Sequence, residues 1–461
     1  MTTEKKCFKC QGILPQDAPE GLCPACLYQQ AMETLPDKTL LLSKEMATQT
    51  IRSQELPPGA PGKPPVKLRR VGAAGSPDAE CDFQLLSMLG QGGMGLVYQA
   101  RQTSISRSIA LKMMRSAKPD DQDRQALFLA EALVTGQLDH PNIVPIYDLG
   151  MDEAGHLFYA MKELKGQPWS DSIGHQTLQE NLDVLLRVGD AVAFAHSRGV
   201  IHRDLKPQNV MLGEYGEVVL MDWGLAAAIT TGSPALRVSK NTALCGTPAY
   251  MAPEMANGLW NRIGPQSDVY LLGAILFEIL EGTPPHLMGR DDPTDALTAA
   301  RLNKIAAAKT PGELQDIARK AMATEPADRF ASVKDFQAAI RVFREHQESD
   351  RLAVLARQRF EAALASKRYD DYAESVFGYR QALRLWPDNQ AAQQGLNQAA
   401  LQYARTALDQ GDLDLSLSLL KEEDETQRKL AQKVRQRLEE RTRQTARIRA
   451  LRRSLAFAGA T

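Results

Sequence analysis

The sequence lacks long apolar runs, carries almost no net charge and holds few cysteines. It contains no run of 18 or more apolar residues, so we expect no membrane-spanning helix within it. The formal net charge is -1, with 55 Lys and Arg against 56 Asp and Glu, which argues against general nucleic-acid binding. The first six residues, Met-Thr-Thr-Glu-Lys-Lys, lack the apolar core of a secretory signal peptide, so we expect no such leader.

The overall composition is typical of a soluble protein with several domains. Hydrophobic residues make up 43% of the chain and charged residues 24%, which suits globular folding. The 461 residues exceed the size of one ordinary domain. We therefore expect about two to four folded units.

Four of the six cysteines lie at the start of the chain, as two Cys-x-x-Cys pairs separated by 12 residues. They are Cys7, Cys10, Cys23 and Cys26. Each pair can present two thiolates to one ion, and two pairs complete a tetrahedral zinc site. We predict a zinc ribbon over residues 1–30 that binds one structural Zn²⁺. A redox pair is an alternative without a supporting βαβ pattern, and a nucleic-acid-binding ribbon is another with only three nearby lysines.

Residues 31–81 are predicted to be a linker. Residues 55–79 alone contain six prolines and four glycines, a composition that disfavours regular structure. Lys67, Arg69 and Arg70 form a small basic cluster in this segment, and we expect it to be solvated.

Downstream, a glycine-rich turn joins two predicted strands. Its glycines would let backbone amides approach phosphate groups where any Cβ would collide; they are Gly90, Gly92 and Gly95. Val97 lies on the strand that leaves the turn, and Ala110 and Lys112 lie on the strand after it. A dinucleotide-binding fold also uses glycine-rich turns, but there the turn joins a strand to a helix.

Two amphipathic helices and a strand follow. Apolar residues recur at helical spacing over 121–138, with Glu131 on this helix, and again over 178–197. Between the helices, the segment Phe158 to Leu164, which contains Met161 and Glu163, looks like a strand followed by a hinge.

The run from His202 to Asn209 places an acid, a cation and an amide on a loop, because Pro207 breaks any helix. These three groups are Asp204, Lys206 and Asn209. Asp222 follows thirteen residues after Asn209. Carboxylate and amide oxygens are ligands that Mg²⁺ prefers, so this loop and Asp222 are a candidate magnesium site.

This ordered set, closed by Ala252-Pro253-Glu254, resembles the eukaryotic-type (Hanks-type) Ser/Thr protein kinases of bacteria. The resemblance implies an α+β, two-lobed protein kinase fold over 82–345, with ATP and Mg²⁺ (or Mn²⁺) as cofactors. It also implies protein substrates and a cytoplasmic location, at the cytoplasmic face of a membrane if the natural chain continues past Thr461. The alternative is a catalytically idle scaffold with a kinase fold, which the intact set of motifs argues against.

The resemblance also implies residue roles. Asp204 would accept the substrate hydroxyl proton, Lys206 would steady the transferred phosphoryl group, and Asn209 and Asp222 would bind Mg²⁺. Lys112 would contact the α- and β-phosphates and pair with Glu131. The ATP site as a whole would comprise Gly90, Gly92, Gly95, Val97, Ala110, Lys112, Met161, Glu163 and Leu164. Trp223 departs from the family, which usually has Phe there, and this bears on switching more than on chemistry.

Regulation is expected in the segment after Asp222. Phosphorylation of Thr242, or else Ser239, would give Arg203 a bidentate partner and order the segment. Autophosphorylation between two copies would need a homodimer. Glu254 and Arg329 resemble the ion pair that ties this segment to the C-lobe, and Asp268 the group that caps the catalytic loop.

The C-terminal part is predicted to be an all-α tail. In residues 350–424, Tyr379-x2-Ala382-x4-Pro387 matches the closing part of a tetratricopeptide repeat, which suggests helical hairpins for protein partners. Residues 425–461 are predicted to form a basic charged helix. A solvated helix, a coiled coil and a juxtamembrane segment remain open as interpretations of it.

Overall fold

The computed structural model describes residues 66–73, 81–91, 95–115, 122–228, 236–237, 245–287, 293–309, 311–421 and 424–458. Several residues with a predicted functional role lie outside these ranges, namely Cys7, Cys10, Cys23, Cys26, Gly92, Ser239 and Thr242. The described chain divides into two compact units, Met1–Ala338 and Ala339–Thr461.

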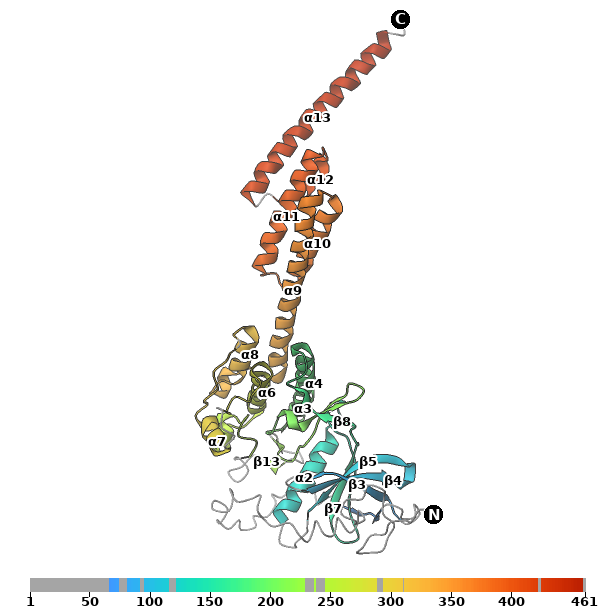
Figure 1. Ribbon diagram of the computed structural model, residues 1–461, viewed down its shortest axis with the longest axis vertical. Coiled ribbons are helices and arrows are strands. Elements are labelled where there is room, and N and C mark those ends of the chain that lie inside the picture. Colours follow the sequence, from blue (N-terminus) through green and yellow to red (C-terminus); the bar gives the residue numbers. More distant parts are fainter. Residues whose placement is uncertain are drawn as a thin grey trace, which may run out of the picture. The chain divides into compact units, whose positions relative to one another are not determined.

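The first unit opens with a seven-stranded sheet in the order β1-β6-β7-β5-β4-β3-β2 (Figure 1). Its strands are β1 (Lys67–Leu68), β2 (Val71–Gly72), β3 (Phe83–Gln91), β4 (Gly95–Gln102), β5 (Arg107–Met114), β6 (Ile146–Met151) and β7 (Leu157–Met161). A short 3-10 turn, η3 (Thr103–Ile105), joins β4 to β5. Helix α2 (Gln122–Gln137) lies against the sheet (Figure 1) and agrees with the helix expected over 121–138.

Strand alternation gives the sheet two apolar faces. Leu111 and Phe158 belong to one buried cluster, whereas Ala110 and Tyr159, one residue away from each, belong to another. Because side chains alternate along a strand, β5 and β7 each contribute to both clusters. The second cluster also contains Phe128 of α2, so the helix covers this face.

Residues 66–72, which we call the clasp, add a two-residue strand at each edge of this sheet. β1 pairs with β6, and β2 pairs with β3. Arg69 Nε lies 2.8 Å from Asp148 Oδ2, and Val66 and Val71 pack against the two apolar clusters. The sequence analysis placed these residues in a solvated linker, whereas their main chain and Arg69 belong to the fold.

The rest of the first unit is mainly helical. Its elements are β8 (Gly166–Pro168), α3 (Trp169–Ser172), α4 (Leu178–Ser197), β9 (Val200–Ile201), η4 (Pro207–Asn209), β10 (Val210–Gly213), β11 (Val218–Leu220), β12 (Ala227–Ala228), β13 (Leu236–Arg237), α5 (Pro253–Ala256), α6 (Pro265–Glu281), α7 (Pro293–Arg301), α8 (Glu313–Ala321) and η5 (Pro326–Asp328). Thr177 caps α4 through a capping box with Glu180, which fixes where the helix begins. α6 is buried from Ser267 to Phe277 and forms the centre of this lobe.

The second unit is built from helices. These are α9 (Val333–Ser366), which begins before the unit boundary, α10 (Tyr369–Leu385), α11 (Gln390–Asp409), α12 (Leu413–Ser418) and α13 (Glu425–Ala458). The kinase fold was predicted to end at residue 345, whereas α9 passes through this position and continues to Ser366. Tyr372 is almost fully buried in the core of the unit. Among the described residues, no helix combines the length and the apolar character that crossing a bilayer requires.

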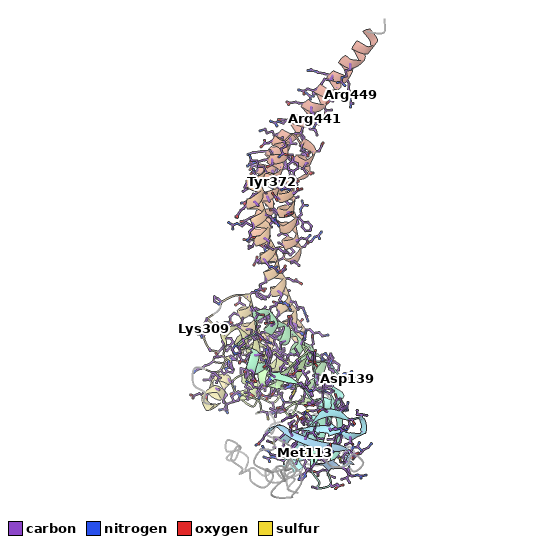
Figure 2. All side chains as sticks on the ribbon, turned by 45° about the vertical axis from the view of Figure 1, so that its right-hand side comes forward. Met113, Asp139, Lys309, Tyr372, Arg441 and Arg449 are labelled. Atoms are coloured by element: carbon purple, nitrogen blue, oxygen red, sulfur yellow. The ribbon has the colours of Figure 1, made fainter. Side chains whose placement is uncertain are left out.

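Helix α13 has two different halves. Its first half packs through Val434 on Leu408 and Leu413, which are buried in one cluster. Every residue from 439 to 450 is exposed, and Arg441 and Arg449 extend from this half (Figure 2). Packing on α11 and α12 therefore stabilises only the beginning of this helix.

We predict that the clasp stabilises the N-terminal sheet. A chain that starts at residue 74 loses two strands, the Arg69–Asp148 pair and the packing of Val66 and Val71. Two partly buried valines and a half-exposed ion pair contribute about 2–3 kcal/mol. The melting temperature should fall by roughly 5–10 °C for a domain of this size. Calorimetry of the chain that starts at residue 74, beside one that starts at residue 64, measures the difference in melting temperature. Equal melting temperatures would refute the predicted stabilisation.

Candidate active site

Lys112 and Glu131 form a desolvated ion pair between the sheet and α2. Lys112 Nζ lies 2.6 Å from Glu131 Oε1, and the side chains are 14% and 2% exposed. Screening by water is weak at such a buried pair, so the attraction fixes the position of both groups. The pair holds the Lys112 ammonium at the face of the sheet that α2 covers.

Four apolar residues that the sequence analysis assigned to nucleotide binding belong to one cluster. They are Val97, Ala110, Met161 and Leu164. Ala110 and Met161 are directly opposite each other in the pairing of β5 with β7. The Glu163 carboxylate accepts a hydrogen bond from Gln99 Nε2 at 2.8 Å, which ties the segment after β7 to β4.

The described glycines of the turn have different surroundings. A Cβ added at Gly95 would lie 2.4 Å from the Met113 carbonyl oxygen, so the neighbouring strand requires glycine here. At Gly90 no heavy atom lies within 4 Å of an added Cβ. Close strand packing therefore explains Gly95, whereas the open space at Gly90 leaves room for a ligand.

Asp204 is the centre of the loop from His202 to Asn209. Its Oδ2 lies 2.9 Å from Lys206 Nζ, and its Oδ1 accepts a hydrogen bond from Thr247 Oγ1 at 2.7 Å. Lys206 Nζ also donates to Thr247 Oγ1 at 2.7 Å, which closes a three-residue ring of contacts. Burial alone would raise the pKa of Asp204, but Lys206 and Thr247 outweigh it and hold the pKa below its usual value. Asp204 is therefore a carboxylate at neutral pH.

The main chain of this loop is fixed by Asp268, a fully buried residue of α6. Asp268 accepts the backbone N–H groups of His202 and Arg203, both at 2.9 Å, and lies 2.7 Å from His196 Nε2. His202 Nδ1 in turn accepts the Asp204 N–H at 3.2 Å. Burial lowers the pKa of His202, which keeps this ring neutral and able to accept that bond. His202 therefore orients the backbone of Asp204 and is held itself by Asp268.

Asn209 and Asp222 offer oxygen atoms that suit a Mg²⁺ ion. Asn209 Nδ2 donates to the Asp204 carbonyl oxygen at 2.8 Å, which leaves the amide oxygen as a ligand atom, and the Asp222 side chain is exposed. Mg²⁺ usually keeps several waters and takes one or two protein oxygens beside phosphates, so this small donor set fits it. Within the described ranges, no three His, Cys, Asp or Glu side chains gather into a metal-binding group.

Trp223 directly follows Asp222 and lies in the interior of the protein. It is 1% exposed, and its ring centroid lies 4.6 Å from that of His202. Among the described residues, its Nε1 has no hydrogen-bond partner. Trp223 therefore packs as a flat apolar side chain, and its buried donor carries a cost that Phe would avoid.

Arg203 is buried and lies near Leu225 and Gly246, at the two ends of the segment in which phosphorylation was predicted. Its Nε donates to the Leu225 carbonyl oxygen at 2.6 Å, and a Cβ added at Gly246 would lie 3.0 Å from the Arg203 carbonyl oxygen. Burial lowers its pKa, and the neighbouring Cys245 and Asp268 oppose this effect. Its φ angle of 69° is unusual for a residue other than glycine.

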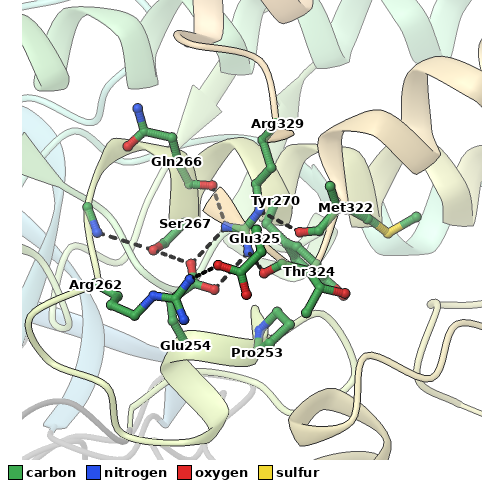
Figure 3. A network of polar contacts seen from close by, with 12 residues as sticks. Pro253, Glu254, Arg262, Gln266, Ser267, Tyr270, Met322, Thr324, Glu325 and Arg329 are labelled. Carbon is green, nitrogen blue, oxygen red and sulfur yellow. Dashed lines mark hydrogen bonds and ion pairs between the residues drawn. The ribbon is translucent and has the colours of Figure 1, made fainter. Parts of the chain in front are cut away.

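Glu254 and Arg329 form a bidentate ion pair in the helical lobe (Figure 3). Arg329 Nη1 and Nη2 lie 2.7 Å and 2.8 Å from the two carboxylate oxygens, and the side chains are 0% and 2% exposed. The remaining Arg329 N–H groups donate to the carbonyl oxygens of Gln266, Ala323 and Thr324. A buried pair with all donors used therefore holds α5 against the start of α6.

Sequence analysis missed two polar contacts at the site. Tyr159 Oη donates to Glu131 Oε1 at 2.7 Å, and Tyr250 Oη donates to Glu278 Oε2 at 2.8 Å. Burial raises the pKa of Glu278 to about 7. Strand alternation could have identified Tyr159, because it shares a face with Met161, but no local pattern marks Glu278.

One family model covers most of the first unit. A family model described as the protein kinase domain matches residues 83–354. The clasp precedes this match.

Three curated bacterial proteins illustrate the similarity. A serine/threonine-protein kinase PknD from Chlamydia muridarum is 32% identical over 293 residues, which cover 56% of this chain and 31% of that protein. A probable serine/threonine-protein kinase PknB from Bifidobacterium longum is 34% identical over 275 residues, which cover 56% and 39%. A serine/threonine-protein kinase pkn3 from Myxococcus xanthus is 31% identical over 278 residues, which cover 56% and 49%. The matched region spans less than half of each of these relatives.

Proposed function

Because the chain belongs to the protein kinase family and carries a serine/threonine kinase domain, we propose that it transfers the γ-phosphoryl group of ATP to Ser or Thr hydroxyls of proteins. The observation that carries the proposal is the ring of contacts among Asp204, Lys206 and Thr247. It holds an ionised carboxylate and a cation side by side at the edge where Asn209 and Asp222 offer metal ligands. Phosphoryl transfer depends mainly on such positioning and on charge stabilisation.

In the proposed mechanism each residue has one task. Asp204 accepts a hydrogen bond from the substrate hydroxyl, orients its oxygen and takes its proton. Lys206 places positive charge where negative charge develops, and Lys112 binds phosphate oxygens. Mg-ATP supplies the phosphoryl group and the metal charge that neutralises it, and Asn209 and Asp222 would hold the metal.

We propose that phosphorylation of Thr242, with Ser239 as the second choice, activates the enzyme. Support comes from Arg203, because its Nε donates to the Leu225 carbonyl oxygen and its main chain lies beside Gly246, so the residue lies between the two ends of the segment that carries Thr242. Thr242 precedes Gly246 by four residues, a reach of roughly 13–14 Å of extended chain. A phosphate brings about -1.5 to -2 charges and accepts one to three charge-assisted hydrogen bonds. Transfer between two copies would need a homodimer.

We also propose that the four N-terminal cysteines bind one structural Zn²⁺. Their paired spacing supports it, since four thiolates complete a closed tetrahedral site. A closed site leaves no open coordination position, so we assign this metal no part in phosphoryl transfer.

The helices of the second unit are proposed to form tetratricopeptide-like hairpins for protein partners. Their close packing supports this, because a Cβ added at Gly395 would lie 2.3 Å from the Tyr379 ring, and one at Gly378 would lie 2.9 Å from Ala356 Cβ. A catalytically idle scaffold with a kinase fold is the alternative function. Phosphate release from ATP with a generic protein substrate separates an active kinase from such a scaffold. We place the protein in the cytoplasm, where a kinase finds ATP.

We predict that Asp204→Asn lowers kcat by about 10²-fold or more, the scale of a positioned base, while ATP binding and the melting temperature stay close to wild type. Asn keeps the shape and can still accept from Thr247. Asp316→Asn, an exposed site on α8, is the matched control. Radiolabel transfer to a generic substrate measures the rate, and an unchanged rate would remove Asp204 from the mechanism.

We predict that Thr242→Ala lowers activity about ten- to a hundredfold, because the unphosphorylated segment stays less populated in its active arrangement. Arg203→Ala should abolish the gain from phosphorylation and spare basal turnover. Mass spectrometry after incubation with Mg-ATP locates the phosphate. Equal turnover of phosphatase-treated and autophosphorylated enzyme would contradict the proposal.

Elemental analysis of the purified protein should give about one zinc per chain. Cys23→Ser should release the metal and leave kinase activity nearly intact, because the proline-rich linker separates this segment from the kinase domain. A metal-free chain whose first 30 residues resist proteolysis as well as the wild type would exclude the zinc ribbon.

A further inference from the structure

We propose that Tyr159 is a positioning residue for phosphoryl transfer: its hydroxyl holds the Glu131 carboxylate and, through it, the Lys112 ammonium group. The inference deepens the proposed kinase function and rests on it, since Lys112 is the residue that would contact the phosphates. Tyr159 lies outside the glycine-rich turn, the catalytic loop and the metal-binding pair.

The sheet itself places the phenol beside the ammonium group. Lys112 on β5 is directly opposite Tyr159 on β7 in the antiparallel register, and opposite residues project to the same face. Lys112 Nζ lies 5.6 Å from the centre of the Tyr159 ring. Both groups meet at one atom, Glu131 Oε1, at 2.6 Å and 2.7 Å.

Glu131 depends on both donors because it is buried. The residue is 3% exposed, and its Oε2 has no hydrogen-bond partner among the described residues. A buried carboxylate is costly unless it is paired and hydrogen-bonded. Lys112 and Tyr159 therefore supply the stabilisation that keeps this charge in place.

The two donors differ in what else they must do. An ammonium group has three N–H donors and would share them between Glu131 and the phosphates when ATP is bound. Burial, followed by the nearby charge of Glu131, raises the pKa of Tyr159 well above its usual value, so this hydroxyl stays protonated. Tyr159 is thus the donor that remains with Glu131 throughout the catalytic cycle.

The same side chain also connects α2 to the sheet. The Tyr159 ring lies 5.2 Å from the Phe128 ring of α2, and both belong to the apolar cluster between helix and sheet. Ring packing resists separation of helix and sheet, and the hydroxyl fixes where the Glu131 carboxylate lies relative to the sheet. Tyr159→Phe removes only the second contribution, which makes it the informative variant.

Hydrogen exchange and kinetics of the full chain test the proposal. In nucleotide-free Tyr159→Phe, amides of residues 122–137 should exchange faster than in the wild type, because α2 loses a buried tether. Its kcat should fall about tenfold, the scale of one hydrogen bond to a buried charge, with KM for ATP changed far less. Tyr147→Phe, an exposed tyrosine on β6, is the control and should leave both quantities unchanged.

A double-mutant cycle separates positioning from general stability. Once Glu131→Ala has removed the acceptor, adding Tyr159→Phe should lower kcat by less than about twofold, because the partner of the hydroxyl is gone. A further tenfold loss in that background would overturn the proposal, as would wild-type exchange and kinetics in Tyr159→Phe. If the wild type itself transfers no phosphate, the proposed function fails, whereas the exchange of α2 still tests the tether.

Discussion

The geometry at Asp204 depends on one carboxylate that no substrate would touch. Asp268 is buried at the start of α6 and accepts two backbone N–H groups of the catalytic loop while it contacts His196 of α4. Buried N–H groups without partners would be costly, so this one side chain decides the path of the loop. The interior of the helical lobe, and not the surface of the site, therefore sets the position of the Asp204 carboxylate.

Two residues beside these contacts have unusual backbone conformations. Arg203 and Asp222 both have positive φ angles, 69° and 57°, which residues other than glycine rarely adopt. Such conformations persist only where the surroundings over-determine them, and they are common at functional sites. Here Asp268 fixes the Arg203 N–H, and the residue after Asp222 is the buried Trp223, whose ring lies against His202. The loop that carries Asp204 and the segment that carries Asp222 are thus supported by a shared set of buried side chains.

Local patterns in the sequence were sufficient for much of the fold. Apolar spacing located α2 and α4 to within about one residue, and the motif order indicated the kinase fold that the family match shows. Contacts between distant segments were not accessible in the same way. β1 is two residues long and pairs with residues about eighty positions later, so its proline-rich surroundings hid it. The Tyr159–Glu131 bond likewise depends on how α2 sits on the sheet, which no spacing rule gives.

The clasp has a consequence for how copies of this protein can associate. A long strand at the edge of a sheet offers unpaired N–H and C=O groups to a strand from another molecule. Here β3 and β6, which would otherwise be the edge strands, each have a two-residue partner, and among the described residues the sheet ends in these short segments. The clasp therefore covers Phe83 and Gln84 of β3 and Gly150 and Met151 of β6, so a strand from another molecule could pair at these positions only after displacing it.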